Sequence, residues 1–144
     1  MQVTEVMTRD VLIVNPDQSI GEAAKLMADN DCGSLPVGEN DRLVGMITDR
    51  DIVVRGLAKG KDGTAKVRDV MSEEVKYCYE EDDVDEVARN MGELQVRRLP
   101  VINKDKRLVG IVALGDIANT DDTQSVGEAL SAISEPTSQN GAAH

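Results

Sequence analysis

The stretch Arg42-Leu43-Val44-Gly45-Met46-Ile47 decides the fold, because it returns later in the chain as Arg107-Leu108-Val109-Gly110-Ile111-Val112. Three shorter matches occur in the same order: Val6-Met7-Thr8 with Val70-Met71-Ser72, Leu35-Pro36-Val37 with Leu99-Pro100-Val101, and Asp51-Ile52 with Asp116-Ile117. The offset is 64 residues up to the proline and 65 after it. A period of this length predicts duplicated supersecondary units that bury apolar faces against each other, with clefts between the two halves.

The composition argues against a nucleic-acid partner. The 144 residues suit one compact domain, and 27 acidic residues against 16 basic ones give a net charge of −11. Such a surface repels a phosphate backbone. Tyr77 and Tyr79 are the only aromatic residues, so the chain lacks a platform on which bases could stack.

The sequence also predicts no membrane partner and a cytoplasmic location. It has no apolar run of the length that a membrane helix needs, and no basic segment followed by an apolar run at its start. The two cysteines, Cys32 and Cys78, have no metal-ligand spacing. We therefore expect two free thiols in a reducing compartment and no metal site.

Each half is predicted to run strand, helix, strand, strand, helix. In the first half, Val11–Val14 is a β-branched run that predicts a buried strand, and Ser19 with Glu22 forms a capping box ahead of an apolar helical face. Asp83 and Glu86 hold the same positions in the second half. Turns at residues 38–41 and 103–106 predict two hairpins, and further helices are expected to begin near Thr48 and Leu114.

These elements give predicted domain boundaries. The first repeat covers residues 1–60, a linker covers 61–69, and the second repeat covers 70–120. The tail contains Ser125-Val126-Gly127-Glu128-Ala129-Leu130, which resembles the start of the first helix. It predicts a short amphipathic helix over 121–134, with apolar positions 126, 129, 130 and 133, followed by a disordered tail over 135–144.

Candidate chemistry gathers where the apolar strand of the first repeat runs into a helix. Thr48 is placed to cap that helix, where unpaired N–H groups favour a phosphate. Asp51 follows one turn later, with a carboxylate that can accept two hydrogen bonds from the vicinal hydroxyls of a ribose, and Arg50 adds a cation. The alternative is an ordinary capping box in which Thr48 and Asp51 serve only the helix.

The duplicated unit, its Gly-x-x-Thr-x-x-Asp ending and its Leu-Pro-Val strand resemble a tandem pair of CBS domains, also called a Bateman module. The resemblance covers residues 3–118, and 48–53 and 96–101 are similar to small standalone bacterial and archaeal CBS-pair proteins. It implies an α/β (α+β) fold with two tandem β-α-β-β-α repeats in one pseudo-twofold module. It also implies two clefts for adenosine-containing ligands and a homodimer.

The resemblance assigns residues to each cleft. In the family, the aspartate holds the ribose, the threonine lies near the phosphates, and the segment before the proline of the other repeat lines the base and phosphate side. One nucleotide-binding cleft would then consist of Thr48, Arg50, Asp51, Val96, Arg97, Arg98 and Pro100. A second, weaker cleft would consist of Cys32, Gly33, Ser34, Pro36 and Asp116.

The two predicted clefts are unequal. In the second repeat Ala113 stands in place of Thr48 and Gly115 in place of Arg50, so that only Asp116 remains. Arginine suits phosphate recognition because its planar fork donates two hydrogen bonds at once. We therefore expect one nucleotide per chain, in the cleft built on Asp51. The alternative for Arg97 and Arg98 is ion pairing with the acidic surface. Arg55, Lys59 and Lys61 are expected to be solvated linker charges, and the alternative is that they extend the positive zone of the first cleft.

No catalytic motif is found, and the only histidine is His144, so we expect no enzyme. The predicted function is a regulatory module that binds AMP, ADP or ATP and acts as an energy or metabolite sensor, with S-adenosylmethionine and NAD ranked lower. No cofactor is required, and a protein target is left open. The alternative is an interaction or scaffold protein whose clefts no longer bind nucleotide.

Overall fold

The computed structural model describes residues 1–119 and 132–133, which divide into two compact units. The first-repeat unit contains Leu12–Val75 and Lys106–Leu108. The second-repeat unit contains Met1–Val11, Lys76–Asp105 and the described residues from Val109 onward. Each unit is described by itself.

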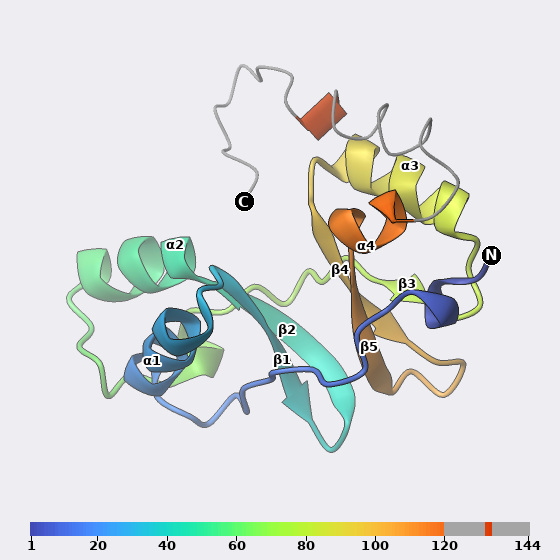
Figure 1. The fold of residues 1–144 in the computed structure, drawn as a ribbon. Coiled ribbons are helices and arrows are strands. Elements are labelled where there is room, and N and C mark those ends of the chain that lie inside the picture. The colour runs from blue at the N-terminus through green and yellow to red at the C-terminus, as the bar shows by residue number, and fades with distance from the viewer. Residues whose placement is uncertain (120–131, 134–144) are drawn as a thin grey trace. The chain divides into compact units, whose positions relative to one another are not determined.

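The first-repeat unit places one helix and a second helical run beside a hairpin (Figure 1). Helix α1 (Ile20–Asn30) precedes the strands β1 (Ser34–Glu39) and β2 (Arg42–Thr48). A continuous helical run follows: α2 (Asp49–Asp51), a π-helical turn (Ile52–Gly56) and a 3₁₀ turn (Leu57–Lys59). A further 3₁₀ turn, Val67–Asp69, precedes the chain's passage to the other unit.

The second-repeat unit has the same order of elements around a three-stranded sheet (Figure 1). A 3₁₀ turn (Val3–Glu5) is followed after residue 75 by β3 (Cys78–Tyr79), α3 (Val84–Leu94), β4 (Arg98–Ile102), β5 (Leu108–Ala113) and α4 (Leu114–Ala118). The sheet order is β3-β4-β5, and β3 is parallel to β4. The predicted mixed fold class and the two repeats are confirmed.

The predicted first hairpin is confirmed in register and turn. Strands β1 and β2 pair antiparallel from Ser34 opposite Thr48 to Glu39 opposite Arg42, with an irregularity at Val37/Gly38. Asn40 and Asp41 form the turn with φ of 55° and 65°. Positive φ at both central residues is the geometry of a two-residue hairpin turn, and asparagine and aspartate tolerate it. This register fixes Thr48 at the end of the hairpin.

The predicted strand Val11–Val14 is wrong. Only Val14 is paired, through one parallel bridge to Val37, while Leu12 and Ile13 are 37% and 41% exposed. The chain leaves the sheet at once, because the Asn15 N–H bonds the Gln18 side chain at 2.8 Å and Pro16 has no N–H to donate. The counterpart in the second repeat, β3, is also only two residues long.

The predicted capping box is confirmed in part in the first repeat and is wrong in the second. Ser19 Oγ accepts from the Glu22 N–H at 3.0 Å, as expected, whereas the Glu22 carboxylate bonds the Gln18 amide instead of reaching back to Ser19. Asp83 makes no side-chain cap bond, because its carboxylate lies 3.8 Å from the Met1 amino group.

The two repeats exchange the segments that lead into them. The first leading segment (Met1–Val11) belongs to the second-repeat unit, where Thr8 and Ile111 exchange backbone hydrogen bonds of 2.8 and 2.9 Å. The second leading segment (residues 67–75) belongs to the first-repeat unit, where Ser72 and Met46 exchange bonds of 2.8 and 3.0 Å. Each repeat therefore completes its structure with the leading segment of the other.

The cores confirm this exchange. In the first-repeat unit Val67 and Val70, from the second leading segment, are buried with Ile20, Met27, Leu35 and other apolar residues. In the second-repeat unit Val3 and Met7 are buried with Val87, Met91 and Leu99. Met27 of α1 and Met91 of α3 are thus core residues of their units.

Each exchanged segment lies against a glycine. A Cβ added at Gly45 would lie 2.8 Å from Met71 Sδ and 2.9 Å from the Ser72 carbonyl oxygen. One added at Gly110 would lie 2.7 Å from Met7 Sδ and 2.8 Å from the Thr8 carbonyl oxygen. The glycine of the repeated Leu-Val-Gly stretch is thus explained by close backbone approach.

The predicted domain boundaries stay a prediction. The predicted helix over 121–134 and the tail over 135–144 lie outside the described residues, apart from 132 and 133. Of these, Ile133 is buried in the second-repeat core, and the Gln95 side chain donates to the Ala132 carbonyl at 3.2 Å.

Substitution of Gly45 or Gly110 by alanine is expected to lower the free energy of unfolding by about 1–3 kcal/mol, because the new methyl group overpacks against backbone. Urea unfolding measures the effect. Gly115→Ala is the control, since nothing lies within 4 Å of its added Cβ. Equal stability of all three variants would contradict the close approach.

Candidate functional site

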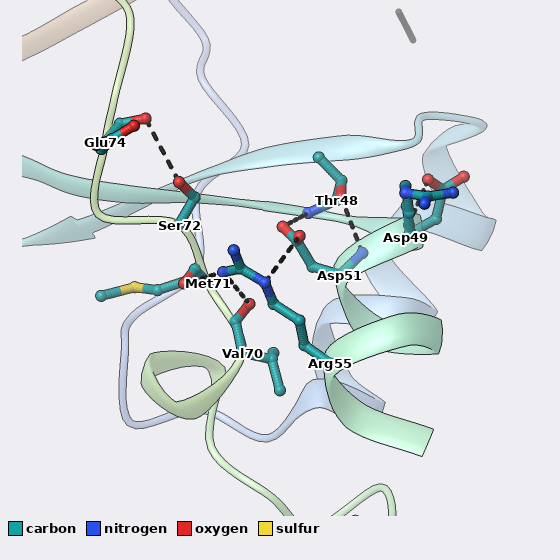
Figure 2. A network of polar contacts seen from close by, with 9 residues as sticks. Thr48, Asp49, Asp51, Arg55, Val70, Met71, Ser72 and Glu74 are labelled. Atoms are coloured by element: carbon teal, nitrogen blue, oxygen red, sulfur yellow. Dashed lines mark hydrogen bonds and ion pairs between the residues drawn. The ribbon is translucent and has the colours of Figure 1, made fainter. Parts of the chain in front are cut away.

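Thr48 and Asp51 form a reciprocal cap where β2 runs into α2 (Figure 2). Thr48 Oγ1 accepts from the Asp51 N–H at 3.0 Å, and Asp51 Oδ2 accepts from the Thr48 N–H at 3.0 Å. The ordinary capping box, which the sequence left open as an alternative, is therefore present. This cap uses Oδ2 of the Asp51 carboxylate and leaves Oδ1 outside the cap.

The second oxygen of Asp51 remains able to accept hydrogen bonds. Asp51 Oδ1 lies 4.0 Å from Arg55 Nε, which is an ion-pair distance and too long for a hydrogen bond. The Asp51 side chain is 18% exposed, so it is only partly removed from solvent. A carboxylate oxygen in this state can accept from hydroxyl groups.

The contacts of Arg55 were not predicted from the sequence. Its Nη1 donates to the Met71 carbonyl at 3.1 Å and to the Val70 carbonyl at 3.5 Å (Figure 2). It is therefore neither a freely solvated linker charge nor a simple extension of a positive zone. The spacing of four residues from Asp51 on a helical run was the signal that could have found it.

Asp49 joins this site to the start of β1. The Asp49 N–H donates to the Gly33 carbonyl at 2.9 Å, and a Cβ added at Gly33 would lie 3.1 Å from Asp49 Oδ2. Asp49 Oδ1 also accepts from the Arg50 N–H at 2.8 Å, while Arg50 is exposed. Ser34 pairs with Thr48 across the hairpin. Within this unit, Gly33 and Ser34 thus lie next to the Thr48–Asp51 cap.

The corresponding place in the second-repeat unit has half of the cap. Asp116 Oδ2 accepts from the Ala113 N–H at 3.0 Å, but Ala113 has no hydroxyl with which to return the bond. The Leu114 N–H donates to the Arg97 carbonyl at 2.8 Å. Arg97 and Arg98 are exposed. The inequality that the sequence predicts between the two aspartates is thus visible in their hydrogen bonds.

The predicted site residues fall into two groups by unit. The first-repeat unit holds Cys32, Gly33, Ser34, Pro36, Thr48, Arg50 and Asp51. The second-repeat unit holds Val96, Arg97, Arg98, Pro100 and Asp116. Cys32 is half-buried, Val96 is half-buried, and both prolines are buried. Each predicted cleft combines residues of both units, and these pairings stay predictions.

The two tyrosines and the second cysteine lie in the second-repeat unit. Tyr77 and Tyr79 make an edge-to-face pair with ring centroids 5.7 Å apart. The hydrogen bond with Tyr77 raises the pKa of Tyr79. Burial raises the pKa of the Cys78 thiol to about 12, so that it stays protonated and inert at neutral pH.

Within residues 1–119 and 132–133, no group of three or more His, Cys, Asp and Glu side chains is arranged to hold a metal ion. No helix among the same residues is long and apolar enough to cross a membrane.

Comparison with known proteins agrees with the duplicated architecture. The family model for the CBS domain matches residues 3–57 and 67–123. A CBS domain-containing protein of Bacillus subtilis, YhcV, is 44% identical over 133 residues, which are 92% of this chain and 94% of that protein.

Three solved structures are similar. Hypoxic Response Protein I with two coordinated zinc ions has a TM-score of 0.73 and 40% identity over 82% of this chain and 97% of that one. CBSX2 in complex with AMP has a TM-score of 0.72 and 27% identity, with coverages of 81% and 93%. The CBS domain pair of protein MJ0100 with 5-methylthioadenosine and S-adenosyl-L-methionine has a TM-score of 0.69 and 29% identity, with coverages of 82% and 93%.

The unequal caps make opposite predictions for the two repeats. Thr48→Ala is expected to lower the free energy of unfolding by about 1 kcal/mol, because the Asp51 N–H loses its acceptor. Ala113→Thr is expected to raise it by a similar amount, since Ala113 has an extended backbone (φ −110°, ψ 150°) like that of Thr48. Urea unfolding of both variants measures this, and a change of the same sign in both would contradict it.

Proposed function

Because the chain belongs to the CBS-domain family, we propose that it is a regulatory module that binds an adenosine-containing ligand through Asp51. The observation that carries the proposal is the unequal use of the Asp51 oxygens. Oδ2 serves the helix cap, while Oδ1 keeps its capacity to accept from the vicinal hydroxyls of a ribose.

The ligand class is supported by the chemistry that the similar structures share. AMP, 5-methylthioadenosine and S-adenosyl-L-methionine, the molecules bound to CBSX2 and to the MJ0100 pair, all contain adenosine. A ribose-binding carboxylate serves all three. For this chain we propose AMP, ADP or ATP ahead of S-adenosylmethionine and NAD. The exposed cations Arg50, Arg97 and Arg98 favour a ligand with a phosphate over S-adenosylmethionine, which has none.

The proposed site has the composition expected from the sequence. Thr48, Arg50 and Asp51 would supply the ribose and phosphate contacts, and the segment Val96–Arg98 with Pro100 would complete them. The second site, with Asp116 and residues 32–36, is proposed to be weaker because Ala113 offers no hydroxyl. These assignments rest on the family resemblance and on the local geometry of each unit.

The proposed output is regulatory, with no reaction of its own and no resident cofactor. A ligand that binds one arrangement of the chain better than another shifts the population towards it, as in an energy or metabolite sensor. Val53, Val54 and Leu57 are 55%, 41% and 58% exposed on one helical run. Such an apolar surface supports the further proposal of a homodimer. We also propose a cytoplasmic location, which the sequence predicts.

A scaffold role is the second candidate. The observation that favours it is the closed Thr48–Asp51 cap, which is complete without any ligand. In that case the exposed apolar surface would bind a protein and nucleotides would have no effect.

Calorimetric titration with adenosine, AMP, ADP, ATP, S-adenosylmethionine and NAD separates the two candidates. We expect the parent protein to bind at least one adenosine compound and Asp51→Asn to weaken that binding at least tenfold. The asparagine oxygen can still accept from the Thr48 N–H, so the cap and the fold survive while its NH₂ group faces the ribose. Asp116→Asn is the matched control and is expected to have a smaller effect.

Two further outcomes are informative. Arg97→Gln with Arg98→Gln is expected to weaken AMP binding more than adenosine binding, if these arginines meet the phosphate. Absence of binding by the parent protein to every compound would overturn the nucleotide proposal and favour the scaffold.

A further inference from the structure

Arg55 contacts two parts of the first-repeat unit at once. Its Nε faces Asp51 Oδ1 at 4.0 Å, and its Nη1 donates to the Met71 and Val70 carbonyls at 3.1 and 3.5 Å. One planar guanidinium thus lies between the aspartate and the second leading segment (Figure 2). The side chain is 54% exposed, and these contacts join it to both parts of the unit.

The second leading segment is held on its other side by β2. Ser72 and Met46 exchange backbone hydrogen bonds, and Met71 Sδ lies 2.8 Å from the position that a Cβ on Gly45 would take. Since β2 ends at Thr48, the segment, the strand and the cap form one connected network. The chain then passes from Val75 into the second-repeat unit at Lys76.

The sequence of the second repeat has no counterpart of Arg55. Arg55 stands four positions after Asp51, whereas the residue four positions after Asp116 is Thr120. The difference between the repeats therefore extends beyond the caps to the cation behind the aspartate.

We propose that Arg55 is a positioning residue that couples ligand binding at Asp51 to the segment Val70–Ser72. This inference rests on the proposed function and deepens it by naming how an occupied site is read out. Arg55 holds Asp51 Oδ1 towards incoming hydroxyls from 4.0 Å, without using its hydrogen-bonding capacity. A carboxylate positioned in advance binds with a smaller entropy loss.

The coupling is reciprocal by thermodynamic linkage. If the contacts of Arg55 with the Met71 and Val70 carbonyls favour the binding orientation of Asp51, then a ligand on Asp51 favours those contacts equally. A ligand bound at Asp51 therefore reduces the local opening of the segment Val70–Ser72, which leads out of this unit. If Arg55 acted only by attracting negative charge, its removal would weaken the binding of ligands that carry a phosphate and leave the binding of adenosine unchanged.

Adenosine and AMP separate these roles, since adenosine has a ribose and no phosphate. We expect Arg55→Gln to weaken the binding of both compounds by a similar factor, about tenfold. Lys59→Gln is the matched control, because it removes the same charge from an exposed position on the same helical run, and it is expected to leave both affinities within about twofold.

Hydrogen exchange of the backbone amides gives a readout that affinity alone does not. Saturating adenosine is expected to slow exchange at Met71 and Ser72 severalfold in the parent protein, and to slow it much less in Arg55→Gln. Arg55→Lys keeps the positive charge but loses the planar guanidinium fork. We expect saturating adenosine to slow exchange at Met71 and Ser72 as little in Arg55→Lys as in Arg55→Gln. Unchanged exchange in the second-repeat unit confirms that the variants are folded.

The outcomes distinguish the two proposals. A parent protein that binds neither compound overturns the proposed function and the coupling together. A parent that binds, with Arg55→Gln equal to Lys59→Gln in affinity and exchange, overturns the coupling alone. A loss confined to AMP also overturns it, and assigns Arg55 to phosphate attraction.

Discussion

The structure depends on two close approaches, those of Met7 to Gly110 and of Met71 to Gly45. Each brings the leading segment of one repeat onto a strand of the other, where paired backbone hydrogen bonds hold it. The hydrophobic cores then close over valines that those segments supply. A glycine at each position is what permits backbone and thioether to lie so near the strand. Each unit therefore needs residues from both repeats of the sequence to complete its core.

The candidate site uses the same framework. Strand β2, which receives the second leading segment, ends at Thr48, and the cap follows immediately. Asp51 therefore has a structural role through one oxygen and is available for a ligand through the other. Because the two oxygens have separate roles, Asp51 can cap the helix and still accept a hydrogen bond from a ligand. Its counterpart Asp116 has the same single cap bond, without the threonine and without an arginine four residues later.

The sequence predicted what is local and periodic. The repeat, the hairpin at Asn40–Asp41 and the cap at Thr48 all follow from short-range patterns and are present. The strand at Val11–Val14 was wrong because an apolar β-branched run indicates burial but not pairing, and pairing depends on which backbone lies alongside. The exchange of leading segments and the carbonyl contacts of Arg55 join residues distant in sequence, which no local pattern specifies. The predicted ligand contacts that combine both repeats stay predictions for the same reason.

The exchange of leading segments also sets an order of events during synthesis. Met1–Val11 is synthesised before Lys76 and the residues that follow it, yet its place is in a core that is built from those later residues. The first-repeat core, by contrast, can close as soon as Val67 and Val70 have emerged. The apolar residues Val3 and Met7 therefore cannot reach their buried positions until the strands and helices after Lys76 have been synthesised. The first-repeat core can thus form before the second-repeat core is complete.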